Sequence, residues 1–374
     1  MTLPDFYKQF NKDIEWINHN TVYLARHGSR AYNTHTPESD EDFKGICIPT
    51  KPYFLGSIQR FEQAELKDPD TAIYEIRKFF KLAAESNPNI IEVLYVDDSD
   101  VLYMDEIGKQ IREMRDQFLS KRVKHTFMGY AISQLKRIKL HRRYLLNPPT
   151  KEPTRTDFGL PEQTIIPRDQ LMAAEAEVRK EIDRFHFDFM EDLTEPTKIS
   201  IRETVNSMLS ELKITSDVHW NAAARKVGLT DNFIEAMQKE RAYKGARAEW
   251  EQYHNWKKTR NKKRFETEEK YGYDVKHGYH LVRLCRMCEE ILTTGKVIVR
   301  RPDRDELMDI RNGKMPFDVL MNFAEQMDEK LQGIYEACAI LPRTPDFKAI
   351  DKVLIQMIER SFERDVERAK RSAA

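Results

Sequence analysis

The stretch HGSRAYNTHTPESDEDFKG, residues 27–45, decides the fold that this sequence predicts. It follows TVYLAR (21–26), a β-branched and aromatic run that predicts a short strand, and it runs into DFKGICI (42–48), which predicts a second strand. Between them, Gly28 lets the backbone approach a phosphate group closely, and the hydroxyl of Ser29 can donate to a phosphate oxygen. The segment therefore predicts a strand, a phosphate-binding turn and another strand.

Acidic residues stand at the start of the second predicted strand. Because side chains alternate along a strand, Asp40, Asp42 and Lys44 share one face. Two such carboxylates can hold two Mg²⁺ or Mn²⁺ ions, hard cations that prefer oxygen ligands. A third acid, Glu92, interrupts the apolar run IIEVLYV (90–96), which predicts a buried strand. We expect Asp40, Asp42 and Glu92 to be metal ligands and catalytic acids, with a paired structural acid as the alternative for Glu92.

The turn and the acidic pair together fit one chemistry. Taken singly, Gly28 and Ser29 form an ordinary turn, and the two aspartates belong to a solvated loop. In combination they predict in-line displacement at the α-phosphorus of a bound NTP, in which metal ions activate an acceptor hydroxyl and neutralise the leaving pyrophosphate.

The composition is that of an ordinary globular protein. The 374 residues are 40% hydrophobic, and 62 Lys and Arg balance 62 Asp and Glu, so a polyanionic partner would have to meet a local patch. No targeting pattern stands at the amino terminus, and no apolar run approaches the roughly 18 residues of a membrane span. Four cysteines fit a reducing compartment. We expect a cytoplasmic protein without a membrane partner, and the oligomeric state stays open.

Two of the cysteines form a C-x-x-C pair. Cys285 and Cys288 follow His277 and His280, which is compatible with a zinc site. The segment from 280 to 292 has the apolar spacing of a helix, however, and no second cysteine pair lies at zinc-ribbon distance. We therefore expect a packed helix face.

One interval departs from the balance of charge. Residues 117–150 contain no Asp or Glu but several basic residues that could contact the phosphates of RNA or of the NTP. These are Lys121, Arg122, Lys124, Lys136, Arg137, Lys139, Arg142 and Arg143. A solvated helix face is the alternative, but the lack of matching acids favours a phosphate-binding surface.

These motifs resemble a known family. The Gly-Ser turn followed by Asp-x-Asp is similar to the signature of the DNA polymerase β superfamily. More narrowly, the chain resembles the nucleotidyltransferases associated with RNA ligases and RNA repair, over about residues 22–313. The segments that carry this resemblance are YLARHGSRAYN, SDEDFKGI, NPNIIEVLY, FLSKRVKHTFMGYAISQLKRI, DFGLPE, KYGYDVKHGYHLVRL and EEILTTGKVIV.

The resemblance implies a metal-dependent enzyme that transfers NMP from an NTP, with ATP favoured, to an RNA or tRNA end. The nucleotide-binding residues that it implies are Gly28, Ser29, Lys44, Lys276, His277 and Arg283. At helical spacing Lys276, His280 and Arg283 share one side, which faces either the nucleotide or the palm.

The resemblance and the periodicity together predict an α+β fold. A polymerase β-like palm, a mixed sheet with helices, would occupy residues 1–115, followed by a helical region with the basic interval over 116–270 and a helical domain over 271–374. Helices are expected at 4–18, 71–86, 107–146 with a break near 121–126, 169–190 and 277–295, and after Phe317 and Phe347.

Two other functions stay open beside transfer to RNA. The same metal chemistry accepts any positioned hydroxyl, so the chain could transfer AMP to a Ser, Thr or Tyr of a partner protein. A non-catalytic nucleotide or RNA sensor would be expected to lack a metal-binding carboxylate, whereas all three candidates are present. The basic interval favours RNA as the acceptor.

Overall fold

The chain divides into two compact units in this computed structural model. The structure describes residues 2–12, 14, 16–164, 166–187 and 217–372. One unit combines residues 1–145 with 262–374, and the other contains residues 146–261. The sequence instead suggested breaks after residues 115 and 270. The end of the helix expected at 169–190 lies outside the described residues.

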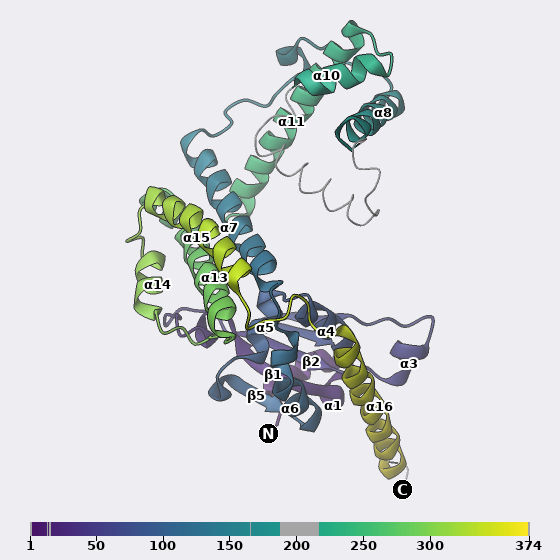
Figure 1. Ribbon diagram of the computed structural model, residues 1–374, viewed down its shortest axis with the longest axis vertical. Helices are drawn as coiled ribbons and strands as arrows, with labels where there is room; N and C mark the ends of the chain where they lie inside the picture. The colour runs from purple at the N-terminus through teal and green to yellow at the C-terminus, as the bar shows by residue number, and fades with distance from the viewer. Residues whose placement is uncertain (1, 13, 15, 165, 188–216, 373–374) are drawn as a thin grey trace. The chain divides into compact units, whose positions relative to one another are not determined.

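The first unit is built on a five-stranded mixed sheet (Figure 1). Its strands are β1 (Thr21–His27), β2 (Asp42–Cys47), β3 (Gln63–Lys67), β4 (Asp70–Glu75) and β5 (Val101–Met104). They lie in the order β3-β4-β2-β1-β5, with β2 and β4 parallel and the other neighbours antiparallel. The predicted α+β class and the first two predicted strands are confirmed.

Helices make up the other described elements. In the first unit they are the 3₁₀ helices η1 (Asp5–Lys12), η2 (Asp98–Asp100) and η3 (Arg115–Phe118) and the α-helices α1 (Ile17–Asn20), α2 (Gly28–Ala31), α3 (Lys51–Leu55), α4 (Ile76–Ala84), α5 (Pro88–Leu94), α6 (Glu106–Glu113), α7 (Val123–Leu146), α12 (Lys262–Tyr271), α13 (Val275–Thr294), α14 (Arg304–Arg311), α15 (Phe317–Ala337) and α16 (Phe347–Ser372). The second unit contains η4 (Arg155–Phe158), α8 (Arg168–Phe187), α10 (Asp217–Lys226) and α11 (Asp231–Thr259). Among the described helices, none is long and apolar enough to cross a membrane.

The sheet separates two apolar layers. Along β1, Tyr23 and Ala25 point into the larger layer, which includes α4, α5, α7 and α13, whereas Leu24 points into a smaller cluster with Tyr7 of η1. Phe43 of β2 also lies in the smaller cluster. Since Asp42 and Lys44 flank Phe43, they face the side of the larger layer.

The helix expected at 71–86 begins only at Ile76. Residues 70–75 form β4 instead, with Thr71, Ile73 and Glu75 buried in strict alternation. The side chain of Glu75 then accepts hydrogen bonds from two backbone N–H groups and caps α4. The expectation was wrong for the first residues because a period of two changes to a helical period without a turn between them.

The strand expected at 90–96 is also wrong. Most of this run belongs to α5, in which Pro88 occupies the first turn and the Asn87 side chain accepts from the N–H of Asn89. A short apolar run fits a buried helix as well as a buried strand, and the cap decides between them. Similarly, the helix expected at 4–18 is divided into η1 and α1. The helices expected within 107–146, at 277–295 and after Phe317 and Phe347 are confirmed.

Gly108 tests how closely α6 approaches β1, and Gly129 of α7 serves as its control. A Cβ on Gly108 would lie 2.1 Å from the carbonyl oxygen of Val22, whereas a Cβ on Gly129 of α7 would meet nothing within 4 Å. We expect Gly108→Ala to lower the free energy of unfolding by about 1–3 kcal/mol through overpacking. Gly129→Ala should raise it by about 0.5–1 kcal/mol, because alanine is the better helix former. Urea unfolding measures both, and equal stabilisation would contradict the close approach.

Candidate active site

The Gly-Ser turn and Asp42 meet where β1 ends. His27, the last residue of β1, pairs with Asp42, the first residue of β2, so Gly28 follows directly beside the carboxylate. A Cβ on Gly28 would lie 2.0 Å from Oδ2 of Asp42, and its φ of +67° belongs to the left-handed region that favours glycine. Glycine is required here for two independent reasons, and the turn and the carboxylate form one site with Ser29.

Three aspartates gather at this end of the sheet. Since β2 and β4 are parallel, Asp42 pairs directly with Asp70, the first residue of β4. Asp40 is exposed in the loop before β2 rather than within the strand. Burial and the carboxylates of Asp70 and Asp40 raise the pKa of Asp42. A cluster of like-charged oxygen donors of this kind fits a hard divalent cation such as Mg²⁺.

Two lysines face these acids. Lys44 lies two residues after Asp42 on the same face of β2, and burial lowers its pKa to about 8 while Glu92 and Asp42 act in the opposite direction. Lys276, in the first turn of α13, is close enough to lower the pKa of Asp42. The acids therefore have two ammonium groups beside them. Carboxylates suit divalent ions, and ammonium groups suit the phosphates of a triphosphate.

Glu92 takes part in a different arrangement, on α5, and its side chain is 0% exposed. It accepts a hydrogen bond of 2.5 Å from the Tyr32 hydroxyl and another from the Arg283 guanidinium, and Nε2 of His27 lies 3.3 Å from it. Burial alone would raise the pKa of Glu92, but Arg283 and the hydrogen bonds from His27 and Tyr32 hold it below its usual range. This is the paired acid that the sequence left as an alternative.

The same ion pair joins α13 to the turn. The guanidinium of Arg283 lies 3.9 Å from the centre of the Tyr32 ring, four residues beyond Gly28. His27, which immediately precedes Gly28, also contacts Glu92. The Glu92–Arg283 pair is therefore attached to the chain on both sides of the Gly-Ser turn.

Residues near the carboxyl end also hold the segment that follows the turn. The hydroxyls of Thr34 and Tyr279 lie 2.7 Å apart. The backbone oxygen of Thr34 accepts from Nη1 of Arg311 at 2.7 Å, and the N–H of Arg301 donates to the oxygen of Tyr32 at 3.1 Å. These contacts come from α13, α14 and the connection between them.

His277 and both cysteines of α13 are buried, and His280 is half-buried. Nδ1 of His277 lies 2.6 Å from Oε1 of Gln134 on α7, and burial lowers the pKa of His280 well below its usual value. Cys285 and Cys288 are in the core, and burial raises the pKa of each thiol. The expected packed helix face is confirmed for the cysteine pair.

The basic interval contains two kinds of side chain. Nζ of Lys121 donates to the oxygen of Tyr335 at 3.2 Å, Lys124 lies 3.9 Å from Asp328, and Nη1 of Arg142 donates to a backbone oxygen at 2.7 Å. These three side chains are therefore already in contact with other residues of the first unit. Arg122 is half-buried.

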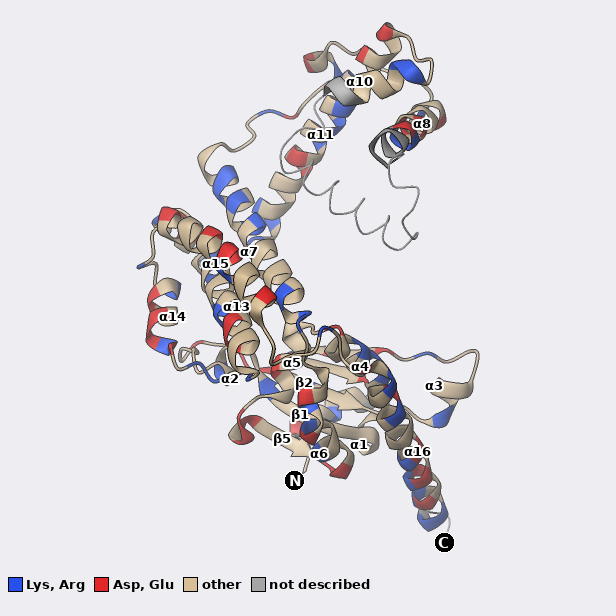
Figure 2. Cartoon of the chain, viewed as in Figure 1, with Lys and Arg blue, Asp and Glu red and all other residues tan. Residues whose placement is uncertain are grey.

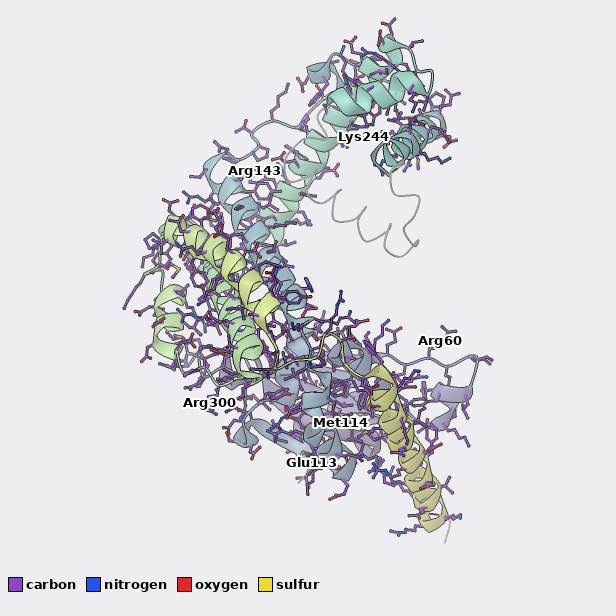
Figure 3. The ribbon with its side chains drawn as sticks, viewed as in Figure 1. Arg60, Glu113, Met114, Arg143, Lys244 and Arg300 are labelled. Carbon is purple, nitrogen blue, oxygen red and sulfur yellow. The ribbon has the colours of Figure 1, made fainter. Side chains whose placement is uncertain are left out.

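The exposed cations of the interval are confined to the second half of α7. They are Lys136, Arg137, Lys139 and Arg143. Figure 2 shows basic residues grouped along this part of α7, and Arg143 lies near its end in Figure 3. We name these residues the α7 cation group, because they are the part of the basic interval placed to meet a large anion.

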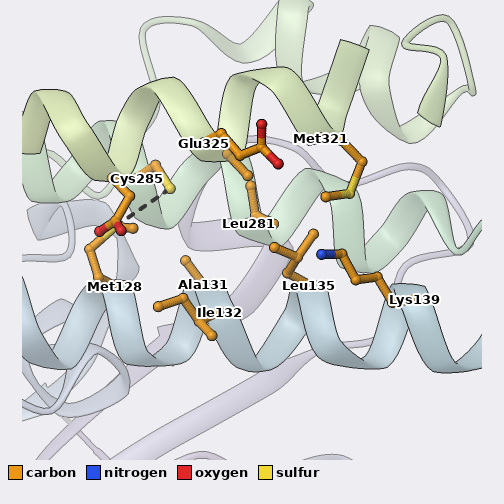
Figure 4. A pocket seen from close by; sticks show the side chains of 11 residues that line it. Met128, Ala131, Ile132, Leu135, Lys139, Leu281, Cys285, Met321 and Glu325 are labelled. Atoms are coloured by element: carbon orange, nitrogen blue, oxygen red, sulfur yellow. Dashed lines mark hydrogen bonds between the residues drawn. The ribbon is translucent and has the colours of Figure 1, made fainter. Parts of the chain in front are cut away.

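A separate hollow lies between α7, α13 and α15. It has a volume of about 140 Å³ and is lined mainly by apolar side chains such as Met128, Leu135 and Leu281 (Figure 4). Lys139 and Glu325 stand at its lining (Figure 4). None of the acids beside Gly28 lines this hollow, so it is not part of the acidic site.

The amino-terminal part of the chain matches a family model. Residues 5–147 match the RNA repair pathway DNA polymerase beta family, RlaP. The matched residues include the whole sheet, the three aspartates beside Gly28 and α7. Lys276, His277 and Arg283 lie beyond the matched residues, although Arg283 forms an ion pair with Glu92 and the charge of Lys276 acts on the pKa of Asp42.

Two curated relatives have similar sequences over part of their length. The uncharacterized 38.9 kDa protein of the nrdC-mobD intergenic region of Enterobacteria phage T4 is 31% identical over 126 residues, 30% of this chain and 37% of the relative. The uncharacterized protein YcgL of Bacillus subtilis (strain 168) is 31% identical over 103 residues, 26% of this chain and 38% of the relative. The chain thus spans just over a third of each relative. No solved structure matches it.

Asp70 is the site residue that the sequence did not suggest. Its signal is the alternation of DTAIYE directly after a turn, which marks a strand start, but the partner strand cannot be read from one sequence. Only the parallel pairing of β4 with β2 brings Asp70 beside Asp42. The same holds for Tyr32 and Arg311, whose roles depend on contacts with distant elements.

The buried ion pair gives a test of whether Arg283 is structural. Arg283→Met leaves the charge of Glu92 buried without its cation and should lower the free energy of unfolding by about 3–5 kcal/mol. Arg286→Met is the matched control on α13, since Arg286 is partly exposed with Asp303 and Glu306, and it should cost under about 1 kcal/mol. Denaturant unfolding compares the two. A stable Arg283→Met protein with weakened nucleotide binding would instead place Arg283 at the nucleotide.

Proposed function

We propose that this chain transfers NMP from an NTP, with ATP favoured, to an acceptor hydroxyl and releases pyrophosphate. The match of residues 5–147 to the RNA repair pathway DNA polymerase beta family supports this proposal. The observation that carries the proposal is the 2.0 Å between Oδ2 of Asp42 and the position of a Cβ on Gly28. A turn suited to phosphates thus closes directly on an acid cluster suited to divalent ions.

Each group in this cluster has a chemical task. Gly28 and Ser29 present backbone N–H and hydroxyl donors to phosphate oxygens. Asp40, Asp42 and Asp70 would hold Mg²⁺ or Mn²⁺, in two ions. When bound, such ions neutralise the leaving pyrophosphate and lower the pKa of the acceptor hydroxyl.

The two lysines complete the nucleotide site in this proposal. Lys44 and Lys276 lie beside the same carboxylates and supply positive charge for the triphosphate. His277 is assigned no contact with the nucleotide, since its ring nitrogens lie near Gln134 and Asp274.

Asp70 takes the place of Glu92 as the third metal ligand. The carboxylate of Asp70 is exposed and adjacent to Asp42, whereas both oxygens of Glu92 already accept hydrogen bonds in the core. Moving Glu92 to a metal would leave Arg283 buried without its anion, which is costly. Glu92 and Arg283 are then positioning residues that act on the turn through His27 and Tyr32.

An RNA or tRNA end is the acceptor that the charge distribution favours. The α7 cation group lies within the residues that match this family, and phosphate neutralisation by such groups supplies most of the affinity for a nucleic acid. The alternative is transfer of AMP to a Ser, Thr or Tyr of a partner protein. It uses the same acids but does not require the α7 cation group.

Asparagine variants separate the two candidates for the third acid. We expect Asp42→Asn and Asp70→Asn to lower the rate of pyrophosphate release from ATP by roughly 100- to 1,000-fold, because each removes a ligand from the metal site. Asp40→Asn should also reduce the rate. All three should unfold at the same denaturant concentration as the wild type, since these carboxylates support no core contact.

The control for this experiment is Asp68→Asn, which alters an exposed acid two residues from Asp70 and should leave the rate unchanged. Glu92→Gln should reduce stability together with activity. Full activity in Asp70→Asn, with an inactive but stable Glu92→Gln, would restore Glu92 as the third ligand. Full activity in Asp42→Asn would refute the proposed site altogether.

The salt dependence of RNA binding tests the acceptor. Changing all four residues of the α7 cation group to Gln should flatten the plot of log affinity against log salt, by about 0.7 for each phosphate of a single strand that these cations neutralise. Asp42→Asn should leave this slope unchanged, because metal ligation and backbone recognition are separate. Filter binding at several salt concentrations measures the slope.

A matched control removes four cations elsewhere in the same unit. Lys348, Lys352, Lys370 and Arg371 are exposed on α16, where acidic residues are interspersed with them (Figure 2). Their change to Gln lowers the net charge equally and should leave most of the slope intact. An equal effect of both sets, or of neither, would remove the support for RNA and bring protein acceptors forward.

A further inference from the structure

A second group of metal-ligating side chains lies where α7 meets the start of α13. His141 comes from α7, His277 from the first turn of α13, and Asp274 is the residue that caps α13. All three are buried, and one ligand atom from each lies within 4.8 Å of the others. None of the aspartates beside Gly28 belongs to this group, and the proposed nucleotidyl transfer makes no use of it.

The carboxylate of Asp274 is fixed by the helix that it caps. Its Oδ1 accepts hydrogen bonds from the N–H groups of Lys276 and His277, at 2.9 and 3.1 Å. Its Oδ2 lies 3.4 Å from Nε2 of His277. Ligand atoms of a tetrahedral ion with bonds of about 2.0–2.1 Å stand about 3.4 Å apart, so this pair already has the spacing of two zinc ligands.

Both imidazoles have a hydrogen-bond acceptor at Nδ1. Nδ1 of His141 lies 3.1 Å from Oε1 of Glu268 on α12, and Nδ1 of His277 lies 2.6 Å from Oε1 of Gln134 on α7. Such acceptors favour the tautomer with the proton on Nδ1, in which Nε2 carries the lone pair. Metal-binding histidines are oriented in this way by carboxylate or carbonyl oxygens.

The electrostatic setting keeps one of these rings in the form that binds a metal. Burial lowers the pKa of His277 to about 4, and Arg264 and Arg137 act in the same direction against Asp274. Two imidazole nitrogens and one carboxylate oxygen suit a borderline-soft ion such as Zn²⁺ better than Mg²⁺, which prefers oxygen.

We propose that His141, His277 and Asp274 bind one zinc-class divalent ion through the two Nε2 atoms and Oδ2. The ion fastens α7 to the first turn of α13, and a water molecule or a further ligand takes the fourth position. Lys276, which faces the acidic site, stands between Asp274 and His277, so the ion also fixes the backbone that carries this lysine. The C-x-x-C pair has no part in the site, since both thiols lie in the core.

Metal content tests this site without any nucleotide. The full chain is incubated with Zn²⁺, dialysed against metal-free buffer and measured for zinc per chain. We expect about one ion in the wild type, in Asp42→Asn and in His125→Ala, the matched histidine control on α7. We expect loss of this ion in His141→Ala and His277→Ala. Wild type without zinc, or both histidine variants with full zinc, would overturn the proposal.

Two further measurements keep the test decisive if the alanine variants do not fold. Co²⁺ in the wild type should give visible d–d absorption without a thiolate charge-transfer band, and such a band would assign the ion to the cysteines and overturn the proposal. Glu268→Gln keeps the shape of the orienting residue and should weaken zinc affinity by about 10–100-fold. Unchanged affinity would show that Glu268 does not orient a ligand and would contradict the assigned geometry.

Discussion

The buried ion pair between Glu92 and Arg283 is the contact on which the rest of the site depends. The two residues are 191 positions apart in the chain, and each would be costly to bury alone. Their pairing attaches α13 to α5 and, through Tyr32 and His27, to both sides of the Gly-Ser turn. The Gly-Ser turn is therefore held by a part of the chain that folds onto the sheet from far away in sequence.

This dependence explains why some residues of the site lie outside the stretch of chain that matches the family model. The family match ends at residue 147, yet Lys276 acts on the pKa of Asp42, and Tyr279 and Arg311 contact the segment after the turn. The acidic chemistry belongs to the sheet, while positive charge and rigidity come from α13 and α14. The inferred zinc-class ion would act at the same junction, since it would hold α13 to α7 beside Lys276.

The sequence predicts the strands on both sides of the Gly-Ser turn, because these depend on local rules. Gly28 follows a strand signal, and Asp42 begins a run with clear alternation. What one sequence does not provide is the pairing between strands, and so it does not predict Asp70, although this residue lies directly beside Asp42. The error over residues 90–96, which form a helix and not a strand, has a different origin, since a short apolar run carries no period that separates a buried helix from a buried strand.

The basic interval shows a similar limit. Its composition predicts a cationic surface, but Lys121, Lys124 and Arg142 instead contact residues from other parts of the first unit. Only packing distinguishes these residues from the α7 cation group. Only four of the eight basic side chains are exposed, so the count of charges is about twice the number available to an anion.

The most direct measurement of the central claim is the fate of the α-phosphate of the NTP. The protein is incubated with Mg²⁺ or Mn²⁺ and each α-labelled NTP, in parallel with total tRNA and with a protein extract, and the label is followed in both pools. The account predicts that label enters the RNA pool, that Asp42→Asn prevents this, and that pyrophosphate is released. Label in the protein pool alone would establish AMP transfer to protein, and label in neither pool would contradict nucleotidyl transfer to a macromolecular acceptor.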